Sequence, residues 1–163
     1  MPYPLRRNVI VRFLACVLFL AALLGVPLLQ PAPALAQMPA PPLLTLPTPP
    51  GAPWRIIQGY GCGTHDDWDF FAIDLVAERG TTLGAPVYAA AAGTVRAWVE
   101  PSGTLILDHG EGFRTQYTHI EPLGTPERRA RIPPGAQVGS VGERGTPGNP
   151  HLHFMLYQEL EPE

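Results

Sequence analysis

The stretch Pro150-His151-Leu152-His153-Phe154-Met155-Leu156-Tyr157, near the C-terminus, decides the fold. After the proline, the apolar side chains at positions 152, 154 and 156 recur with a period of two, which indicates a β-strand. Successive side chains of a strand point to opposite faces, so His151 and His153 share the other face. Two imidazoles placed in this way indicate either a metal or catalytic site, or two surface histidines on an amphipathic strand.

The chain that precedes this stretch is typical of short strands joined by turns. We expect strands at residues 54–58, 70–76, 86–99, 104–107, 113–120 and 136–141. A turn at residues 108–112 joins two of them into a hairpin, and loops are expected at residues 121–135 and 142–150. No stretch has a sustained helical period, so the sequence predicts an all-β domain.

The first 36 residues are typical of a secretory signal peptide. A basic region with three arginines precedes an almost wholly apolar run at residues 13–29, and Ala34-Leu35-Ala36 fits a small-x-small cleavage site. A retained membrane anchor is the alternative, but the run is short for a full span and Pro27 interrupts it. We therefore expect cleavage, no stable membrane insertion of the mature chain, and a secreted, extracytoplasmic location in the cell envelope.

The proline-rich residues 37–53 predict an extended, solvated linker before a domain at residues 54–163. Three of the 11 basic residues leave with the signal peptide, so eight arginines remain against 14 acidic residues, a net charge of about −6. Phosphate recognition needs a basic surface, so no nucleic-acid partner is expected. Cys62 is the single cysteine after the signal peptide, so the fold depends on its core rather than on an internal disulfide.

All the histidines of the chain lie in the expected domain: His65, His109, His119, His151 and His153. His119 ends an expected strand and shares a face with Tyr117, so we expect it to project from the sheet near the later pair. His65 precedes the apolar strand that carries Asp74, where a carboxylate is costly unless it is paired or bound to a metal. Two histidines and one aspartate, with water in the fourth position, fit an open zinc site.

Several segments of the domain together resemble peptidase family M23, the LytM/lysostaphin-type zinc metallopeptidases. They are residues 85–95, Leu107-Asp108-His109-Gly110, Tyr117-Thr118-His119-Ile120, residues 138–142 and Pro150-His151-Leu152-His153-Phe154. The resemblance extends from residue 54 to residue 158. It implies a small antiparallel β-sheet domain of the barrel-sandwich hybrid type, with a groove on one sheet face. It also implies a zinc-dependent endopeptidase that cuts peptide bonds in bacterial peptidoglycan.

The resemblance also implies roles for individual residues. Carried over position by position, it makes the zinc ligands His65, Asp74 and His153, and the catalytic histidines that bind no metal His119 and His151.

The first motif of the family is altered in this sequence. It is usually His-x-x-x-Asp, but Phe70 stands four residues before Asp74. Either Asp69, which has the literal spacing after His65, is the ligand, or Asp74 is the ligand across a longer gap. We favour Asp74, because an acid in an apolar strand needs a partner more than an acid in a polar loop does. Cys62 and His65 also have the spacing of a Cys-x-x-His ligand pair, but an incidental thiol is favoured.

Two other interpretations remain open. The domain is either a non-catalytic relative that binds the cell wall or regulates another wall hydrolase, or an interaction module that only binds metal at exposed histidines. Loss of a metal or catalytic position would mark the non-catalytic relative, and all five candidate positions are filled here. His109 lies in the expected hairpin turn, where a structural hydrogen bond suffices to explain it.

Overall fold

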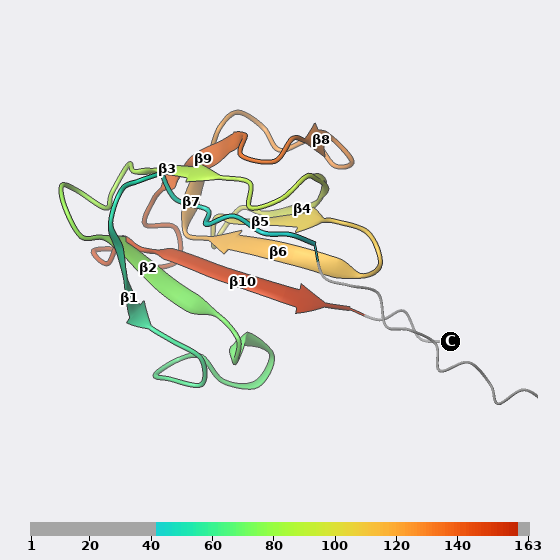
Figure 1. Cartoon of the computed structure of the whole chain (residues 1–163). Helices are drawn as coiled ribbons and strands as arrows, with labels where there is room; N and C mark the ends of the chain where they lie inside the picture. Colours follow the sequence, from blue (N-terminus) through green and yellow to red (C-terminus); the bar gives the residue numbers. More distant parts are fainter. Residues whose placement is uncertain (1–41, 160–163) are drawn as a thin grey trace, which may run out of the picture. The chain divides into compact units, whose positions relative to one another are not determined.

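Two antiparallel sheets form the part of the chain that the computed structural model describes, residues 42–159. The larger sheet has the strand order β1-β2-β10-β6-β5-β4-β8 and the smaller sheet has the order β3-β9-β7 (Figure 1). The strands are β1 Trp54–Gln58, β2 Ile73–Ala77, β3 Pro86–Tyr88, β4 Gly93–Val99, β5 Thr104–Asp108, β6 Phe113–Thr118, β7 Ile120–Pro122, β8 Arg131–Ile132, β9 Gln137–Val141 and β10 Leu152–Gln158.

The helical content of residues 42–159 is a single 3-10 turn, η1 Asp67–Asp69. The expectation of an all-β, antiparallel domain is therefore confirmed, and the sheets do not close into a barrel. No helix in this range is long and apolar enough to cross a membrane. The expected signal peptide at residues 1–36 lies outside the described residues.

The core lies where apolar side chains of the two sheets meet. Alternation along each strand turns one set of side chains of the larger sheet toward the smaller sheet. The buried cluster includes Leu105, Leu107, Tyr117, Leu152 and Phe154 from the larger sheet and Val87, Ile120, Val138 and Val141 from the smaller sheet. The opposite face of the larger sheet is thereby left to polar side chains.

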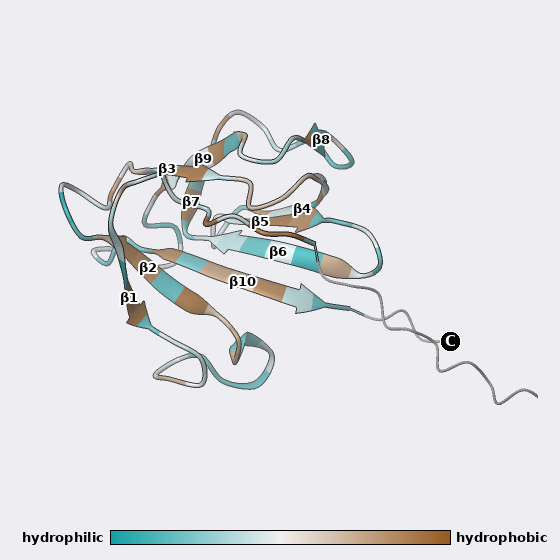
Figure 2. Cartoon of the chain, viewed as in Figure 1, coloured by the Kyte–Doolittle hydropathy of each residue, from teal (hydrophilic) through white to brown (hydrophobic). Residues whose placement is uncertain are grey.

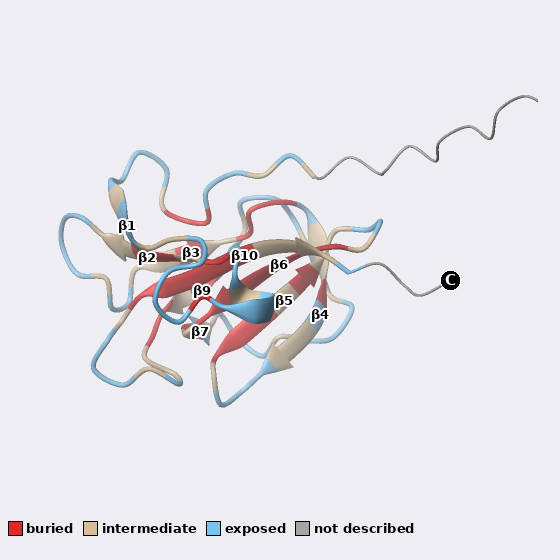
Figure 3. Cartoon of the chain, turned by 90° about the horizontal axis from the view of Figure 1, so that it is seen from below, coloured by how far each residue is buried: buried red, intermediate tan, exposed pale blue. Residues whose placement is uncertain are grey.

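Strand β6 combines a polar sequence with complete burial. Figure 2 shows it as hydrophilic over much of its length, and Figure 3 shows it as buried. Thr115 and Tyr117 face the core, where their hydroxyl oxygens lie 3.0 Å apart. Gln116 and Thr118 alternate to the other face, where their side chains are 3.2 Å apart. A buried polar side chain needs a partner, and each of these has one.

His119 lies at the corner between the two sheets, because β6 belongs to the larger sheet and β7 to the smaller one. Its φ is 66°, a left-handed conformation that few residues other than glycine adopt. Its N–H donates to the carbonyl of Ser102 at 3.1 Å, and its own carbonyl accepts from Gly142 at 2.7 Å. The expectation that His119 shares a strand face with Tyr117 is therefore wrong, since the chain leaves β6 before it.

Strand β2 begins later than the strand that the sequence predicts at residues 70–76. It begins at Ile73, and Phe70 and Phe71 are exposed by 45% and 62%. The expected strand at residues 86–99 is divided between the two sheets, and β8 lies within a segment expected to be a loop. Four residues between β3 and β4 turn the chain from one sheet to the other, which hydrophobicity alone does not reveal.

Part of the proline-rich segment packs on the domain. The N–H of Thr45 donates to the carbonyl of Ala90 at 2.8 Å, and the N–H of Tyr88 donates to the carbonyl of Pro47 at 3.0 Å. Pro47 and Thr48 are buried. The expectation of a fully solvated linker is thus wrong for these residues, because proline carbonyls still accept hydrogen bonds from an unpaired strand edge.

The Tyr117 hydroxyl provides a test of the core. It accepts the N–H of Ala90 at 2.8 Å, and burial raises its pKa, so it stays neutral. Tyr117→Phe leaves that N–H without a partner, and we expect it to lower the free energy of unfolding by about 1–3 kcal/mol. Tyr157→Phe is the matched control, because its hydroxyl bonds to no described residue; a change within about 0.5 kcal/mol is expected. Equal effects of both substitutions in urea denaturation would contradict this account.

Candidate metal and catalytic site

Cross-strand pairing brings His153 and Asp74 together. Strand β10 lies between β2 and β6, and His153 stands directly opposite Asp74 on one side and Thr118 on the other. Directly opposite residues of an antiparallel pair point to the same face, with Cβ atoms about 5 Å apart. The register of β2 with β10 therefore fixes this contact, and a shift of one residue would send His153 into the core.

His65 reaches the pair from a glycine-rich loop. Gly61 and Gly63 have φ values of 61° and 57°, so the chain turns sharply between β1 and η1. The turn brings Nδ1 of His65 to 2.9 Å from the carbonyl oxygen of Gly59. Because a carbonyl only accepts, Nδ1 carries the proton and Nε2 presents its lone pair to the site. His65 is almost fully buried, with 2% of its surface exposed.

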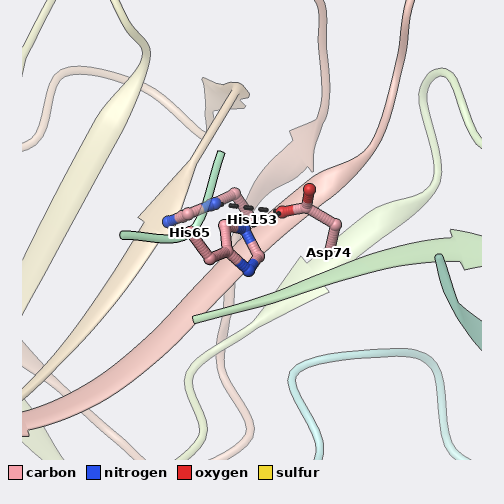
Figure 4. A group of neighbouring side chains, drawn as sticks. All are labelled: His65, Asp74 and His153. Atoms are coloured by element: carbon pink, nitrogen blue, oxygen red, sulfur yellow. Dashed lines mark hydrogen bonds and ion pairs between the residues drawn. The ribbon is translucent and has the colours of Figure 1, made fainter. Parts of the chain in front are cut away.

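Three electron-pair donors converge at this point (Figure 4). Nε2 of His65 lies 3.2 Å from Oδ1 of Asp74, and Nδ1 of His153 lies 3.0 Å from the same oxygen. Two ligands of a tetrahedral zinc ion, each about 2.1 Å from it, lie about 3.4 Å apart. The spacing and the donor types therefore fit a zinc ion held by His65, Asp74 and His153. Three protein ligands are the usual number in a catalytic zinc site, whose fourth position is left to water or substrate.

Asp69 holds His153 from the other side. Its Oδ1 lies 3.1 Å from Nε2 of His153. A proton on Nε2 donated to Asp69 leaves the Nδ1 lone pair directed at Asp74. A carboxylate on the far nitrogen is the usual means by which a metal-binding histidine is oriented. The structure thus places Asp74 among the three converging donors and Asp69 behind them.

His119 and His151 form a second pair on the same face, with ring centroids 4.6 Å apart. Nδ1 of His119 donates to the carbonyl of Arg144 at 2.6 Å, and Nδ1 of His151 donates to the carbonyl of Asn149 at 2.8 Å. With the proton on Nδ1, the Nε2 atom of each ring carries the lone pair. That of His151 lies 3.7 Å from Oδ2 of Asp74.

The electrostatics of the cluster centre on Asp74. Burial alone would raise its pKa, but the hydrogen bond with His153 and the charges of the histidines outweigh burial and lower the pKa. Burial likewise lowers the pKa of His153, but its bond to Asp74 and the charge of Asp69 prevail, so the pKa is raised. Burial lowers the pKa of His119, which stays neutral and able to accept a proton near neutral pH.

A groove of about 540 Å³ opens over these residues. Its floor is the polar face of the larger sheet and its walls are loops. The residues that line it are Gln58, Thr64, Trp68, Asp69, Asp74, Ser102, Thr104, Gln116, Thr118, His119, Gly145, Thr146, Asn149, His151 and His153.

Two other candidates lie outside the cluster. His109 bonds through Nδ1 to the carbonyl of Ala92 at 2.6 Å and through Nε2 to the hydroxyl of Thr115 at 2.8 Å. Both nitrogens are thus occupied, which confirms the expected structural role. Cys62 is exposed and is not among the converging donors.

Two residues that support the site were not found from the sequence in this role. The sequence presents Asp69 only as a possible ligand and gives no indication of a role for Arg144. The Arg144 guanidinium bonds to Glu121, with Nε 2.9 Å and Nη2 2.8 Å from its carboxylate oxygens, and also to Glu100. This clamp positions the carbonyl that orients His119. No local motif reveals it, because Arg144 and His119 are 25 residues apart.

Comparison with known families identifies the domain. The model of the family described as peptidase family M23 matches residues 71–162, more than half of the 163 residues. The match includes Asp74, His119, His151 and His153 but begins after His65.

Relatives and solved structures agree with this match. The peptidoglycan DD-endopeptidase ShyA of Vibrio cholerae is 26% identical over 83 residues, 49% of this chain and 19% of ShyA. A zinc-containing peptidase from Vibrio cholerae superposes with a TM-score of 0.57 at 20% identity, over 72% of this chain and 37% of that one. The deep-sea M23 metalloprotease Pseudoalterin gives 0.58 at 24% identity, over 73% and 72%. The chain thus spans less than half of the first two proteins.

Metal analysis of aspartate variants tests the geometry of the cluster. We expect Asp74→Ala to lose bound zinc, because it removes a charged donor. Asp69→Ala removes only the carboxylate behind His153, and we expect about a 10- to 100-fold weaker affinity with the site retained. Asp66→Ala, an exposed neighbour, is the control. Zinc per chain, measured by mass spectrometry and by competition with a chromogenic chelator, checks both; full zinc binding by Asp74→Ala would refute the assignment.

Proposed function

The chain belongs to peptidase family M23, and from this membership we propose that it is a zinc metalloendopeptidase that hydrolyses peptide bonds in bacterial peptidoglycan. The observation that carries the proposal is the convergence of His65, Asp74 and His153, whose donor atoms all lie within 4.8 Å of one another. A carboxylate and two imidazole lone pairs that are buried together are unfavourable unless a cation lies between them. Zinc suits this donor set.

Zinc in such a site supplies Lewis acidity, which activates water and polarises a carbonyl group. Proton transfer and stabilisation of the oxyanion are left to residues of the chain. His119, with Nδ1 fixed on the carbonyl of Arg144 and a lowered pKa, accepts a proton at Nε2. His151, fixed in the same manner on Asn149, presents its own Nε2 to the developing oxyanion once it is protonated.

The groove supports a peptide substrate. Its floor carries hydroxyl and amide groups from Thr104, Gln116 and Thr118, which suit the polar backbone of an extended peptide. The Thr104 and Thr118 hydroxyls are 3.1 Å apart, so their positions are mutually fixed. ShyA acts on peptidoglycan, and we propose the same polymer here, with an extracytoplasmic location in the cell envelope that follows from it.

A non-catalytic domain of the same fold, which binds the wall or regulates another hydrolase, is the alternative. The position of His119 weighs against it. A left-handed conformation costs a residue such as histidine about 1–3 kcal/mol, and such strain concentrates at functional sites. Binding to the wall alone does not explain why the chain keeps a strained histidine whose Nε2 atom is free to accept a proton.

Substitution of His119 separates metal binding from turnover. We expect His119→Ala to keep its zinc and to hydrolyse peptidoglycan about 10²- to 10⁴-fold more slowly, the usual contribution of a general base or acid. His119→Asn is the second variant, because asparagine tolerates the left-handed backbone and so preserves the corner between the sheets. Turnover of both variants at the wild-type rate, measured by release of soluble fragments, would refute the proposed role.

Digestion of purified peptidoglycan tests the function itself. The full chain should release soluble fragments with new amino termini, an excess of chelator should abolish the release, and added zinc should restore it. Identification of the termini by mass spectrometry then defines the bond that is cut. Binding to the wall without new termini, in zinc-loaded protein, would instead establish the non-catalytic alternative.

A further inference from the structure

Four aromatic side chains in the segment between β1 and β2 are exposed, and one of them, Trp68, lines the groove. They are Tyr60, Trp68, Phe70 and Phe71, which we call the aromatic patch. Their exposed fractions are 61%, 68%, 45% and 62%. The sequence predicts that Phe70 and Phe71 are buried, yet neither contributes to the core. Large apolar side chains gathered on the surface of a domain are unusual and often mark a site of interaction.

The patch is ordered by specific contacts. The ring of Phe71 packs edge-on against Tyr60 and Phe70, with centroids 5.9 Å and 5.0 Å apart. The N–H of Gly61 donates to the carbonyl of Phe70 at 2.9 Å. A Cβ atom at Gly61 would lie 2.6 Å from the Phe70 ring, so only glycine lets the ring rest on this turn. These contacts restrict the exposed rings of Tyr60, Phe70 and Phe71, which lowers the entropic cost of binding a ligand on them.

Trp68 links the patch to the groove. It lies in η1, on the nine-residue step between His65 and Asp74, and it lines the same groove as His153. A ligand that stacks on Trp68 therefore lies next to whatever occupies the groove. The segment that departs from the usual motif spacing is also the segment that carries this surface.

The negative charge of the segment that carries the aromatic patch indicates which class of ligand the patch can bind. Residues 59–72 contain three aspartates and neither arginine nor lysine. Such a segment repels anionic lipid headgroups and phosphates. An uncharged pyranose ring suits it better: its C–H faces pack on aromatic rings, and its hydroxyl groups donate to carboxylates such as the exposed Asp66 and Asp67.

We propose that the aromatic patch binds N-acetylhexosamine units of a glycan strand while the attached peptide lies in the groove. The proposal rests on the proposed function for the polymer that carries both parts. The patch binds the sugar directly and needs no metal, so sugar binding and hydrolysis are separable. A glycan strand held there presents its peptides to the groove.

Calorimetric titration of the full chain with a β-1,4-linked N-acetylglucosamine hexamer, with chelator present, tests this site. We expect saturable binding by the wild-type protein. Trp68→Ala and Phe71→Ala should each weaken it by about fivefold to tenfold, the effect of losing one aromatic stacking contact. Trp68→Phe, which keeps a smaller ring, should retain part of the affinity. Leu123→Ala, which removes an equally exposed apolar side chain elsewhere, should bind like the wild type.

Three outcomes would overturn the proposal: no binding of the hexamer by the wild-type protein, equal binding by Trp68→Ala and Phe71→Ala, or binding of phosphatidylcholine vesicles in its place. Circular dichroism establishes that each variant is folded. Because the hexamer contains no peptide bond between amino acids and the metal is removed, failure of the proposed peptidase activity leaves this measurement unaffected.

Discussion

A buried carboxylate surrounded by imidazoles is the constraint on which the site depends. Asp74 is 7% exposed and faces His65, His151 and His153. Its negative charge is costly away from water unless cations or hydrogen-bond donors surround it. The carbonyl of Gly59 accepts from Nδ1 of His65 and the carboxylate of Asp69 accepts from Nε2 of His153, so the ring nitrogens nearest Asp74 can give their lone pairs to a cation. The site is therefore arranged for a cation that His65, Asp74 and His153 bind together.

The larger sheet makes this arrangement possible. Asp74 and His153 meet because β2 and β10 pair in one register, and the same β10 pairs with β6, whose polar face forms the groove floor. His119 belongs to neither sheet and reaches the site only because its backbone takes the left-handed turn between them. The pairing of β2 with β10 thus fixes the positions of Asp74 and His153. The proposed base, His119, is positioned instead by its left-handed backbone conformation.

The sequence predicts the β-class and the five converging residues because period-two apolar patterns and the histidine motifs are local signals. The preference for Asp74 over Asp69 also had a physical reason, the cost of an acid in an apolar strand, and the structure brings Asp74 to both histidines. The same apolar run was misleading at its start. Phe70 and Phe71 look like core residues, but the core lies between the sheets, and β2 enters it only from Ile73.

Long-range contacts could not be predicted in the same way. Asp69 supports His153 from 84 positions away in the sequence, and Arg144 supports His119 from 25 positions away. No rule of local spacing reveals either contact.

Zinc K-edge X-ray absorption of the purified protein tests the central claim, that His65, Asp74 and His153 bind zinc, most directly. A zinc ion bound by these residues should have nitrogen and oxygen ligands at about 2.0–2.2 Å, with two imidazoles among them. A sulfur atom at about 2.3 Å, from Cys62, or a shell without imidazole would contradict it.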